Sequence, residues 1–539
     1  MKTIKIKLKI AALALLFIAV GCETADLEQL ADPSNLTPES ADPQLLINNV
    51  QIRFMSAIAY NEDNEDGLNV RASEAVRMQH LFGAYSGPFS LSATSQDDFW
   101  EDFYKETLID IKSLIPIAEA GDLKGVVGVA KVIQAYTYVT LVDTYGNVPF
   151  TQALDGNEND APAADDGQDI YTAMLDVIDD AISDLSTPGV IMPTNDLFYG
   201  GDAGKWIKAA RTLKFKMYAQ MRLVGDFSSE INTLISQGII EDAADDLQFQ
   251  YSTSALATGD SRHPYYSLCY DADGSDDYMN NYYMFLLKDD KGFNDPRLRY
   301  YFYRQIEETP TGDDLECEGE AGFNFCHIGD FYWGRDHGDD DGVPPDQLKR
   351  TTYGLYPIGG AFDADNFQTV INNPGAAGAG IFPLMLSSYV KFLRAESALM
   401  SGTTGNPRTL FEEGVRASMT KVLEFNPGQV DPAFAATQAD VDNYVTFVLG
   451  QYDAAADNEA KLDVIMKEYY IALWGNGIEA WNNYRRTSYP SDLEPHVNVA
   501  GEFPRTFMYP AVEVSSNESI SQKQVTEKVF WDTNPDNLQ

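Results

Sequence analysis

The segment FYWGRDHGDDDG carries side chains suited to holding a ligand without changing it. It places Tyr332 and Trp333 close to Arg335. An aromatic ring offers a flat apolar face to the C–H face of a sugar, and a guanidinium donates hydrogen bonds to hydroxyl or carboxylate groups. The ring pair Tyr265 and Tyr266 has the same potential. The alternative for all five residues is that they only fix a long loop onto the protein.

A second candidate site is acidic. The segment DADGSDD offers crowded carboxylate oxygens in one turn-forming stretch, which suits Ca²⁺: Asp271, Asp273, Asp276 and Asp277. The spacing differs from an EF-hand loop, because glycine comes fourth rather than sixth and Tyr282 takes the place of the closing glutamate. With 82 acidic residues in the chain, chance clusters are expected too. We therefore name structural calcium as the one metal the sequence suggests, and expect no other cofactor.

Catalytic motifs are absent from the sequence. There is no GxSxG, HExxH or P-loop motif, and the five histidines show no metal-ligand spacing. A glycosidase needs two carboxylates about 5–9 Å apart, and sequence spacing cannot reveal such a pair. We expect a binding protein rather than an enzyme.

The charge of the chain excludes one class of partner. The formal net charge is -44, with 38 basic and 82 acidic residues, and four of the lysines lie in the first nine positions. Nucleic-acid binding needs a basic footprint, so we expect no nucleic-acid partner.

The N-terminus reads as an export signal. Four lysines precede the apolar run Ile10–Val20, which is too short to span a bilayer. The small residues before Cys22 resemble a lipobox, so we expect residues 1–21 to be removed, Cys22 to carry lipid and residues 22–44 to form a tether. A plain signal peptide is the alternative. We expect no later run to be long and apolar enough to cross a membrane, and hence membrane attachment by the lipid anchor alone.

Three cysteines follow Cys22. Cys317 and Cys326 lie in a Gly-rich loop, and a small disulfide-closed loop is as reasonable there as two free thiols. Cys269 would then be a free, buried thiol.

Apolar periodicity predicts helices in most of the remaining chain. The clearest are GVVGVAKVIQAYTYVTLVDTY, ended by Gly146, and KWIKAARTLKFKMYAQMRL. Further helical patterns cover about 45–60, 97–119, 168–185, 385–401, 407–423 and 461–474. No composition break separates two cores, so residues 45–539 are predicted to form one domain.

Helical periodicity disappears between about 251 and 380. This stretch is rich in Gly, Asp, Tyr and Pro, and unstructured connections of that length are usually functional or disordered. Its aromatic content favours an ordered insertion, so the ligand site is predicted here.

Several stretches together resemble the SusD/RagB family of Bacteroidetes outer-membrane lipoproteins. Besides the lipobox, they are LVDTYGNVPFTQAL, GFNDPRLRYYF, YVKFLRAESALMSG, IMKEYYIALWGNGIEAWNNYRRTSYP and FPRTFMYPAVEVSSN. The acidic residues after Cys22 also resemble the signal that sends lipoproteins of these bacteria to the cell surface.

The resemblance implies a mainly α fold of tetratricopeptide-like hairpins with a long loop-rich ligand-binding insertion. It implies a non-enzymatic surface protein that captures an oligosaccharide, or less often an oligopeptide, for a SusC-like TonB-dependent transporter. Two alternatives remain open: a surface glycan hydrolase that uses loop carboxylates, and a helical-repeat adaptor that binds only protein.

Overall fold

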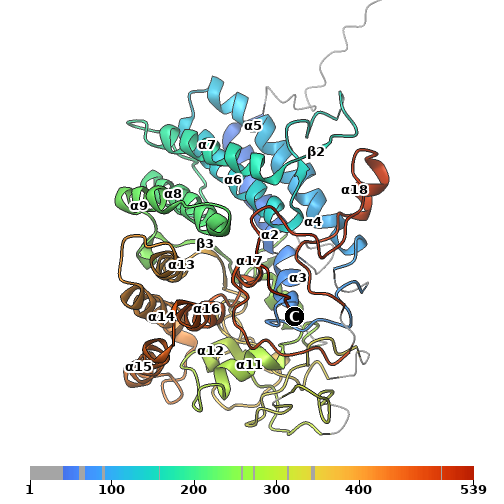
Figure 1. Ribbon diagram of the computed structural model, residues 1–539, viewed down its shortest axis with the longest axis vertical. Helices are drawn as coiled ribbons and strands as arrows, with labels where there is room; N and C mark the ends of the chain where they lie inside the picture. The colour runs from blue at the N-terminus through green and yellow to red at the C-terminus, as the bar shows by residue number, and fades with distance from the viewer. Residues whose placement is uncertain are drawn as a thin grey trace, which may run out of the picture. The chain divides into compact units, whose positions relative to one another are not determined.

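The computed structural model describes residues 41–59, 67–87, 91–156, 158–256, 259–270, 274–311, 315–323, 325–340, 346–498 and 501–539. The predicted signal, Cys22 and most of the tether lie outside the described residues. Pro43–Gln539 group into one compact unit. This unit is mainly helical, with few and short strands, which confirms the predicted fold class (Figure 1).

The helices of the described residues fall into an N-terminal and a C-terminal set. The first set is α2 (Pro43–Ala59), α3 (Leu68–Ala75), α4 (Asp97–Glu101), the π-helical η3 (Asp102–Leu108), α5 (Ile109–Ala120), α6 (Lys124–Tyr145), α7 (Gly167–Leu185), α8 (Ala203–Gln220) and α9 (Ser228–Gln237). The second set is α13 (Ser387–Met400), α14 (Pro407–Leu423), α15 (Gln438–Ala454), α16 (Asn458–Ala472), α17 (Gly477–Thr487) and α18 (Ala511–Ser516). Between them lie the short helices α10 (Pro264–Cys269), α11 (Asn281–Lys288) and α12 (Leu298–Tyr301) and the single-turn 3₁₀ helices η5 (Ala243–Asp245) and η7 (Val370–Asn372).

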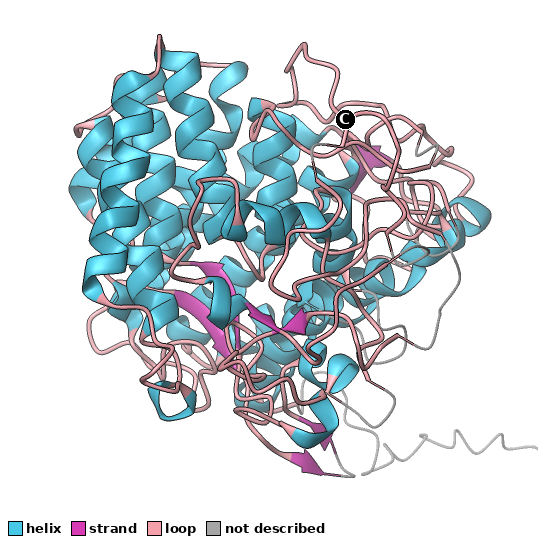
Figure 2. Cartoon of the chain, turned by 90° about the horizontal axis from the view of Figure 1, so that it is seen from below, coloured by secondary structure: helices cyan, strands magenta, loops and turns pink. Residues whose placement is uncertain are grey.

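Successive helices pack as hairpins. The pairs are α5 with α6, α7 with α8, α13 with α14, and α15 with α16. Glycine permits the closest approach, because a Cβ on Gly128 of α6 would lie 2.6 Å from Leu185 Cγ of α7. In Figure 2 the long helices stand side by side on one side of this unit and most loops lie on the other.

The predicted helix boundaries follow local chemistry. Gly146 ends α6 with φ 75°, a conformation that glycine adopts without steric cost. The side chain of Asn406 caps α14 by accepting a hydrogen bond from Thr409 N at 3.1 Å, and Pro407 occupies the first turn. These two helices match their predicted ranges closely.

The helical pattern predicted at 97–119 is confirmed, because α4, η3 and α5 follow one another without a gap, with π-helical geometry in η3. The expectation that no run after the signal could cross a membrane is wrong by length and composition alone, because α6 meets both criteria. Since 89% of its apolar window is buried inside the protein, α6 is a core helix.

The region 251–380 has little regular structure but is ordered by many buried aromatic side chains. The strands of the described residues pair only as antiparallel couples: β1 (Val148–Pro149) with β2 (Ala164–Asp165), β3 (Leu247–Gln250) with β8 (Ile381–Met385), β4 (Ala255–Leu256) with β5 (Gly259–Asp260), and β6 (Phe302–Tyr303) with β7 (Thr352–Tyr353). The β3–β8 pair closes the region, because it joins the chain before the insertion to the chain just before α13.

A buried carboxylate joins the N-terminal helices to the C-terminal segment. Asp143 of α6 accepts hydrogen bonds from Tyr171 of α7, from Asn482 of α17 at 3.1 Å and from Trp531 Nε1 at 2.8 Å. Burial raises the pKa of Asp143, and nearby Lys216 opposes that rise. The aspartate of LVDTYGNVPF therefore has a structural role.

Candidate functional site

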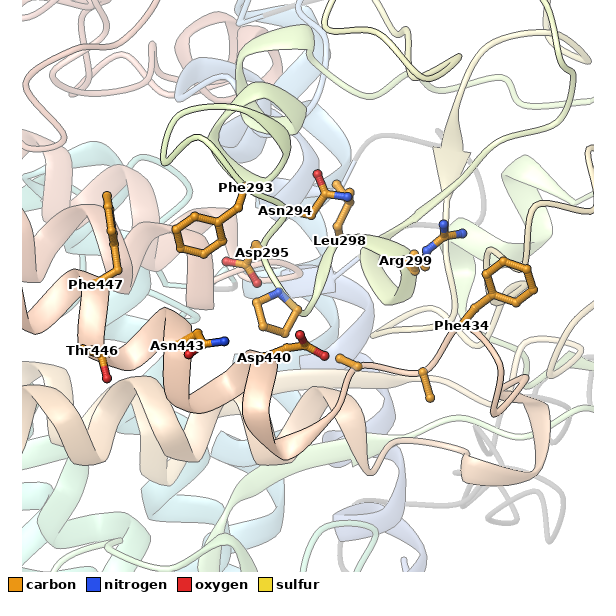
Figure 3. Close-up of a pocket in the computed structure, with 13 residues that line it drawn as sticks. Phe293, Asn294, Asp295, Leu298, Arg299, Phe434, Asp440, Asn443, Thr446 and Phe447 are labelled. Carbon is orange, nitrogen blue, oxygen red and sulfur yellow. The ribbon is translucent and has the colours of Figure 1, made fainter.

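A groove lies between the turn 293–299 and helix α15, and we call it the Phe293–Phe447 groove (Figure 3). Its volume is about 730 Å³, within the range typical of small-molecule sites. The lining residues are Phe293, Asn294, Asp295, Pro296, Leu298, Arg299, Phe434, Ala435, Ala436, Asp440, Asn443, Thr446 and Phe447.

Two aromatic rings at one end of the groove are open to solvent. Phe293 and Phe447 are each 37% exposed, and their ring centroids lie 5.2 Å apart in an edge-to-face arrangement. Phe447 comes from α15 and Phe293 from the turn after α11, so the fold brings them together from distant parts of the sequence. Exposed rings in a groove provide apolar faces that a ligand can cover.

Neutral hydrogen-bonding groups accompany these rings. The side chains of Asn294 and Asn443 are exposed, and neither makes a hydrogen bond to another described residue. An amide can both donate to and accept from hydroxyl or amide groups of a ligand. The rings and these amides together suit a polar, uncharged oligomer.

The carboxylates of the groove are held ionised. Burial alone would raise the pKa of Asp295, but Arg297, whose Nη2 lies 2.6 Å from its carboxylate, outweighs burial and lowers it. Asp440 belongs to the capping box of α15, and the hydrogen bonds that it accepts from Thr437 lower its pKa. The general acid of a glycosidase needs a raised pKa, so neither Asp295 nor Asp440 suits that role.

A ladder of arginines and rings continues from the groove. The guanidinium of Arg299 lies 4.9 Å from the ring centroid of Phe434, and its Nη1 lies 2.7 Å from Asp365 Oδ1. Asp365 also pairs with Arg304, whose guanidinium lies 5.0 Å from the ring of Phe367.

The ladder ends in a pair of partly exposed rings. Phe367 and Phe331 pack edge to face at 5.5 Å. Both have left-handed backbones, with φ 48° and 66°, which a bulky residue rarely adopts. Such conformations are concentrated at ligand and switch sites. The rings extend the aromatic surface beyond the groove.

The residues predicted from sequence occupy other positions. Tyr332, Trp333, Arg335, Tyr265 and Tyr266 are all buried, with at most 4% of each residue exposed. Their contacts are internal and do not bring the five together: Tyr332 packs on Arg304, Trp333 on Arg350, Arg335 on Tyr278, Tyr265 on Tyr353 and Tyr266 on Tyr270. Their role in binding stays a prediction, and Tyr332 is the one that adjoins the ladder.

The acidic segment is described only in part. Asp271 and Asp273 lie outside the described residues. Asp277 accepts hydrogen bonds from Gln79 and Tyr353, and from its neighbouring amide Tyr278 N at 2.7 Å. Asp276 is exposed. The calcium site stays a prediction.

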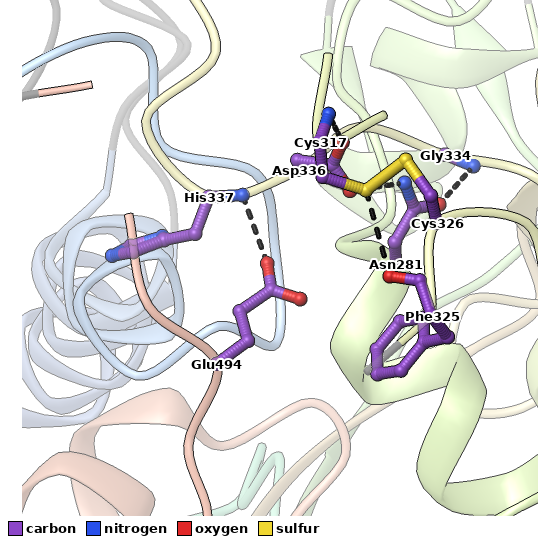
Figure 4. The surroundings of a disulfide bond; sticks show 8 residues. All are labelled: Asn281, Cys317, Phe325, Cys326, Gly334, Asp336, His337 and Glu494. Atoms are coloured by element: carbon purple, nitrogen blue, oxygen red, sulfur yellow. Dashed lines mark hydrogen bonds between the residues drawn. A yellow bond between two sulfur atoms is a disulfide. The ribbon is translucent and has the colours of Figure 1, made fainter. Parts of the chain in front are cut away.

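The loop cysteines are bonded to each other (Figure 4). Cys317 and Cys326 form a disulfide, and Cys269 is a free, buried thiol. The bridged loop is fixed in two further ways: Cys317 N donates to Asp336 at 3.0 Å, and Phe325 stacks on Phe285 at 4.1 Å. Asp336 lies near the two sulfurs, but bridged sulfurs are not metal ligands.

The arginine pair after Trp481 is structural. Arg486 forms a buried ion pair with Glu396. Arg485 instead donates to backbone oxygens of Arg505 and Asp143, both at 2.7 Å, and its guanidinium lies 3.4 Å from the ring of Trp481. Burial lowers the pKa of Arg485 to about 9.

Comparison with known proteins gives consistent matches over nearly the whole chain. Residues 34–329 match a family model described as SusD-like, starch-binding and associating with the outer membrane, and residues 358–530 match one described as SusD and RagB outer membrane lipoprotein. No curated protein matches the chain.

Several solved structures share the fold. One is titled a chitin-binding protein, with a TM-score of 0.68, 22% identity and coverage of 92% of this chain and 100% of its own. A chitin-binding SusD homologue from Flavobacterium johnsoniae has a TM-score of 0.65, 19% identity and coverage of 92% and 100%. A SusD homologue from Bacteroides fragilis has a TM-score of 0.65, 19% identity and coverage of 91% and 99%.

Proposed function

The chain belongs to the SusD-like family of outer-membrane lipoproteins, and from this premise we propose that it captures nutrient oligomers, glycans rather than peptides, in the Phe293–Phe447 groove. The observation that carries the proposal is the pair of exposed rings beside uncommitted amides in a groove of about 730 Å³. Rings cover the C–H faces of sugar units, and amides match their hydroxyl groups. Two similar structures are titled chitin-binding, which also favours a glycan.

The ligand is proposed to be uncharged. The formal net charge of -44 repels anionic polymers at long range, and the groove itself contributes Asp295 and Asp440. The arginines of the ladder do not compensate, because Arg299 and Arg304 already share Asp365. Neutral glycans escape this repulsion.

An oligomer is favoured over a single sugar. The aromatic surface runs from the groove past Phe434 to Phe367 and Phe331. A longer ligand could therefore cover both ring pairs. Tyr332 packs on Arg304, which in turn contacts Phe367 of the second pair.

We further propose that the protein faces the cell exterior and delivers its ligand to a SusC-like TonB-dependent transporter. Family membership supports this partner, and the predicted lipid on Cys22 supports attachment at the membrane. Co-purification from the outer membrane, with a lipidated and a Cys22→Ala chain compared, tests the association.

Binding and hydrolysis are separated by one experiment. The soluble chain, beginning after Cys22, is incubated with oligosaccharide and oligopeptide panels, and the thermal shift and the ligand mass are both recorded. A ligand at about 100 times its Kd adds about 2.7 kcal/mol of stability. A shift with unchanged glycan mass is expected. Shortened products would instead support the hydrolase, and a shift with peptides alone would contradict the glycan proposal.

A further inference from the structure

A pocket separate from the groove lies between the α4–η3 junction, the loop after α6 and helix α18, and we call it the Trp100 pocket. Its volume is about 420 Å³, within the range typical of small-molecule sites. It shares no lining residue with the Phe293–Phe447 groove. Apolar side chains make up much of its lining: Ile109, Pro149, Leu154, Pro162 and Val512.

Two aromatic rings line this pocket together. Trp100 and Tyr104 lie one helical turn apart, and their ring centroids are 4.8 Å from each other with an interplanar angle of 41°. Tyr104 Oη donates to Pro149 O at 2.8 Å, which ties the loop after α6 to the rings. Helix α18 packs on α4, and Val512 N donates to Asp97 Oδ1 at 2.9 Å. These contacts hold three segments that are distant in sequence around one space.

The indole N–H of Trp100 is an uncommitted donor. Only 4% of Trp100 is exposed, and its Nε1 makes no hydrogen bond to a described residue. Trp333 Nε1 also lacks a described partner, but protein encloses it, whereas Trp100 lines the pocket and its Nε1 is not enclosed. Buried tryptophans usually find an acceptor. The remaining tryptophans do so, at Asp196 for Trp206, Tyr356 O for Trp474, Pro504 O for Trp481 and Asp143 for Trp531.

Two parts of the lining have uncommon backbone geometry. The π-helical η3 contributes Tyr104 and Lys105, and π-helical segments are frequent at functional sites. Leu154 has φ 66°, a conformation that residues with a side chain rarely adopt. Its carbonyl oxygen accepts a hydrogen bond from Lys112 Nζ at 2.9 Å, which holds the loop in this conformation. Because strained backbone is concentrated at ligand sites, both features favour a pocket shaped for an occupant.

The charges at the pocket select against an anionic ligand. Lys105 Nζ lies 2.5 Å from Glu101 Oε1, so the cation of the lining is already paired. Glu513 adds a negative charge, and its Oε1 accepts a hydrogen bond from Asn517 Nδ2 at 2.7 Å. A ligand therefore has to supply an acceptor for Trp100 without carrying a negative charge.

We propose that the Trp100 pocket binds a small uncharged aromatic molecule whose oxygen accepts a hydrogen bond from Trp100 Nε1. An aromatic ring gains more than an aliphatic one beside Trp100 and Tyr104, because ring pairs attract each other beyond the area that they bury. The volume of about 420 Å³ limits the ligand to a small molecule. The inference does not depend on the proposed capture of glycans.

Matched probes test the pocket. The soluble chain is titrated with coumarin, an uncharged bicyclic aromatic lactone, and binding is followed by ligand-observed NMR. δ-Valerolactone keeps the lactone oxygens but lacks the aromatic ring, and coumarin-3-carboxylate keeps the rings but adds a negative charge. We expect saturable binding of coumarin. Both relatives should bind at least about 10-fold more weakly, because each lacks a property that the pocket selects.

A variant of the lining locates the binding. A Cβ on Gly156 would meet no described atom within 4 Å, so Gly156→Leu is expected to fold. Its side chain should occupy the pocket and weaken coumarin binding at least about 10-fold. Gly428→Leu makes the same change at a glycine that also has open space around it but lies outside the lining. This control should bind coumarin as the wild type does.

A second variant tests the role of the donor. Trp100→Phe keeps an aromatic ring and removes the N–H. The loss of one neutral hydrogen bond should weaken coumarin binding by about 3- to 10-fold. The affinity for naphthalene, which has two rings but no acceptor oxygen, should change by less than about 2-fold.

The inference is overturned if coumarin does not bind saturably, or if either relative binds as tightly as coumarin. It is also overturned if Gly156→Leu, folded as judged by circular dichroism, binds coumarin as tightly as the wild type. Coumarin binding that is kept in Gly156→Leu and lost in the Phe293→Ala/Phe447→Ala variant would place the probe in the groove and contradict the pocket.

Discussion

Glu494 is a buried carboxyl group that contacts His337. Its Oε1 accepts a hydrogen bond from His337 N at 2.9 Å (Figure 4). Burial, reinforced by the charge of Asp336, raises the pKa of Glu494 from 4.5 to about 8. The native protein therefore holds a proton at neutral pH that the unfolded chain has lost.

This raised pKa makes a prediction about stability. Between pH 4.5 and about 8 the native state binds more protons than the unfolded state, so the contribution of Glu494 to stability falls as the pH rises. Glu494→Gln keeps the acceptor and removes the titration. The free energy of unfolding of the variant should gain on the wild type by roughly 1.4 kcal/mol for each pH unit in this window. Urea unfolding of both proteins at pH 5 and pH 8 measures it, and a constant difference would refute the assignment.

At the residue scale, the sequence shows which side chains could bind a ligand but not which of them are exposed to solvent. Tyr332, Trp333 and Arg335 have the side chains of a binding site, yet the structure buries them. Phe293 lies in the family-like stretch GFNDPRLRYYF and Phe447 in no such stretch, but neither is marked as a ligand contact, because their proximity depends on how a turn and a helix pack. The turn GFNDPR lay inside the predicted ligand region, whereas α15 did not.

Two helix glycines differ in whether a larger side chain would fit at their position. A Cβ on Gly125 of α6 would lie 2.3 Å from the backbone oxygen of Ile191, which cannot move without the chain. A Cβ on Gly450 of α15 would meet nothing within 4 Å. Gly125→Ala should lower the free energy of unfolding by about 1–3 kcal/mol through overpacking. Gly450→Ala should raise it by about 0.5–1 kcal/mol.

The urea midpoints of Gly125→Ala and Gly450→Ala, compared with that of the wild type, measure these two changes in stability. Equal and small shifts for both would show that α6 can move away from the segment after α7, contrary to the close packing described.

The Asp143 junction joins α6, α7, α17 and the C-terminal segment. Asp143→Ala would leave the donors of Tyr171, Asn482 and Trp531 without their acceptor. Because leaving a buried donor unsatisfied costs about 1–3 kcal/mol, Asp143→Ala should lower the free energy of unfolding by at least about 3 kcal/mol. Asp176→Ala, at an exposed position of α7, is the control and should change stability by less than about 0.5 kcal/mol. Similar values for both variants, from urea unfolding, would contradict the structural role.

At the element scale, most of the helical fold was predictable and part of it was not. Strong periodicity and clear caps define α6, α7 and α14 in the sequence. Helix α15 was missed because QADVDNYVTFVLGQYDA is rich in β-branched residues and contains glycine, both unfavourable for helices. Its helical state is favoured by the Thr437–Asp440 capping box and by packing on α14 and α16.

For the whole molecule, the predicted lipid anchor determines where the protein is found in the cell. Lipid on Cys22 would hold the protein at the membrane, because several acyl chains together give stable attachment. Cys22→Ala should therefore move most of the protein from the membrane to the soluble fraction after cell lysis. Fractionation and immunoblotting measure this, and an unchanged membrane fraction would contradict attachment by lipid alone.

Membership of the SusD-like family could be inferred from ordered motifs spread along the chain, but the location of the groove could not. The motif LVDTYGNVPFTQAL marks the Asp143 junction. GFNDPRLRYYF supplies one wall of the groove, but the other wall comes from residues 434–447, which no motif marks.

The central claim is that the Phe293–Phe447 groove binds a neutral glycan. The most direct test is calorimetric titration of one bound oligosaccharide into the wild type, the Phe293→Ala/Phe447→Ala double variant and the control Ile191→Ala, which removes an exposed apolar side chain outside the groove lining. Losing two stacking rings should cost about 1.4–2.8 kcal/mol, which is a 10- to 100-fold rise in Kd. Ile191→Ala should bind as the wild type does. Unchanged affinity of the folded double variant would place the glycan elsewhere and contradict the claim.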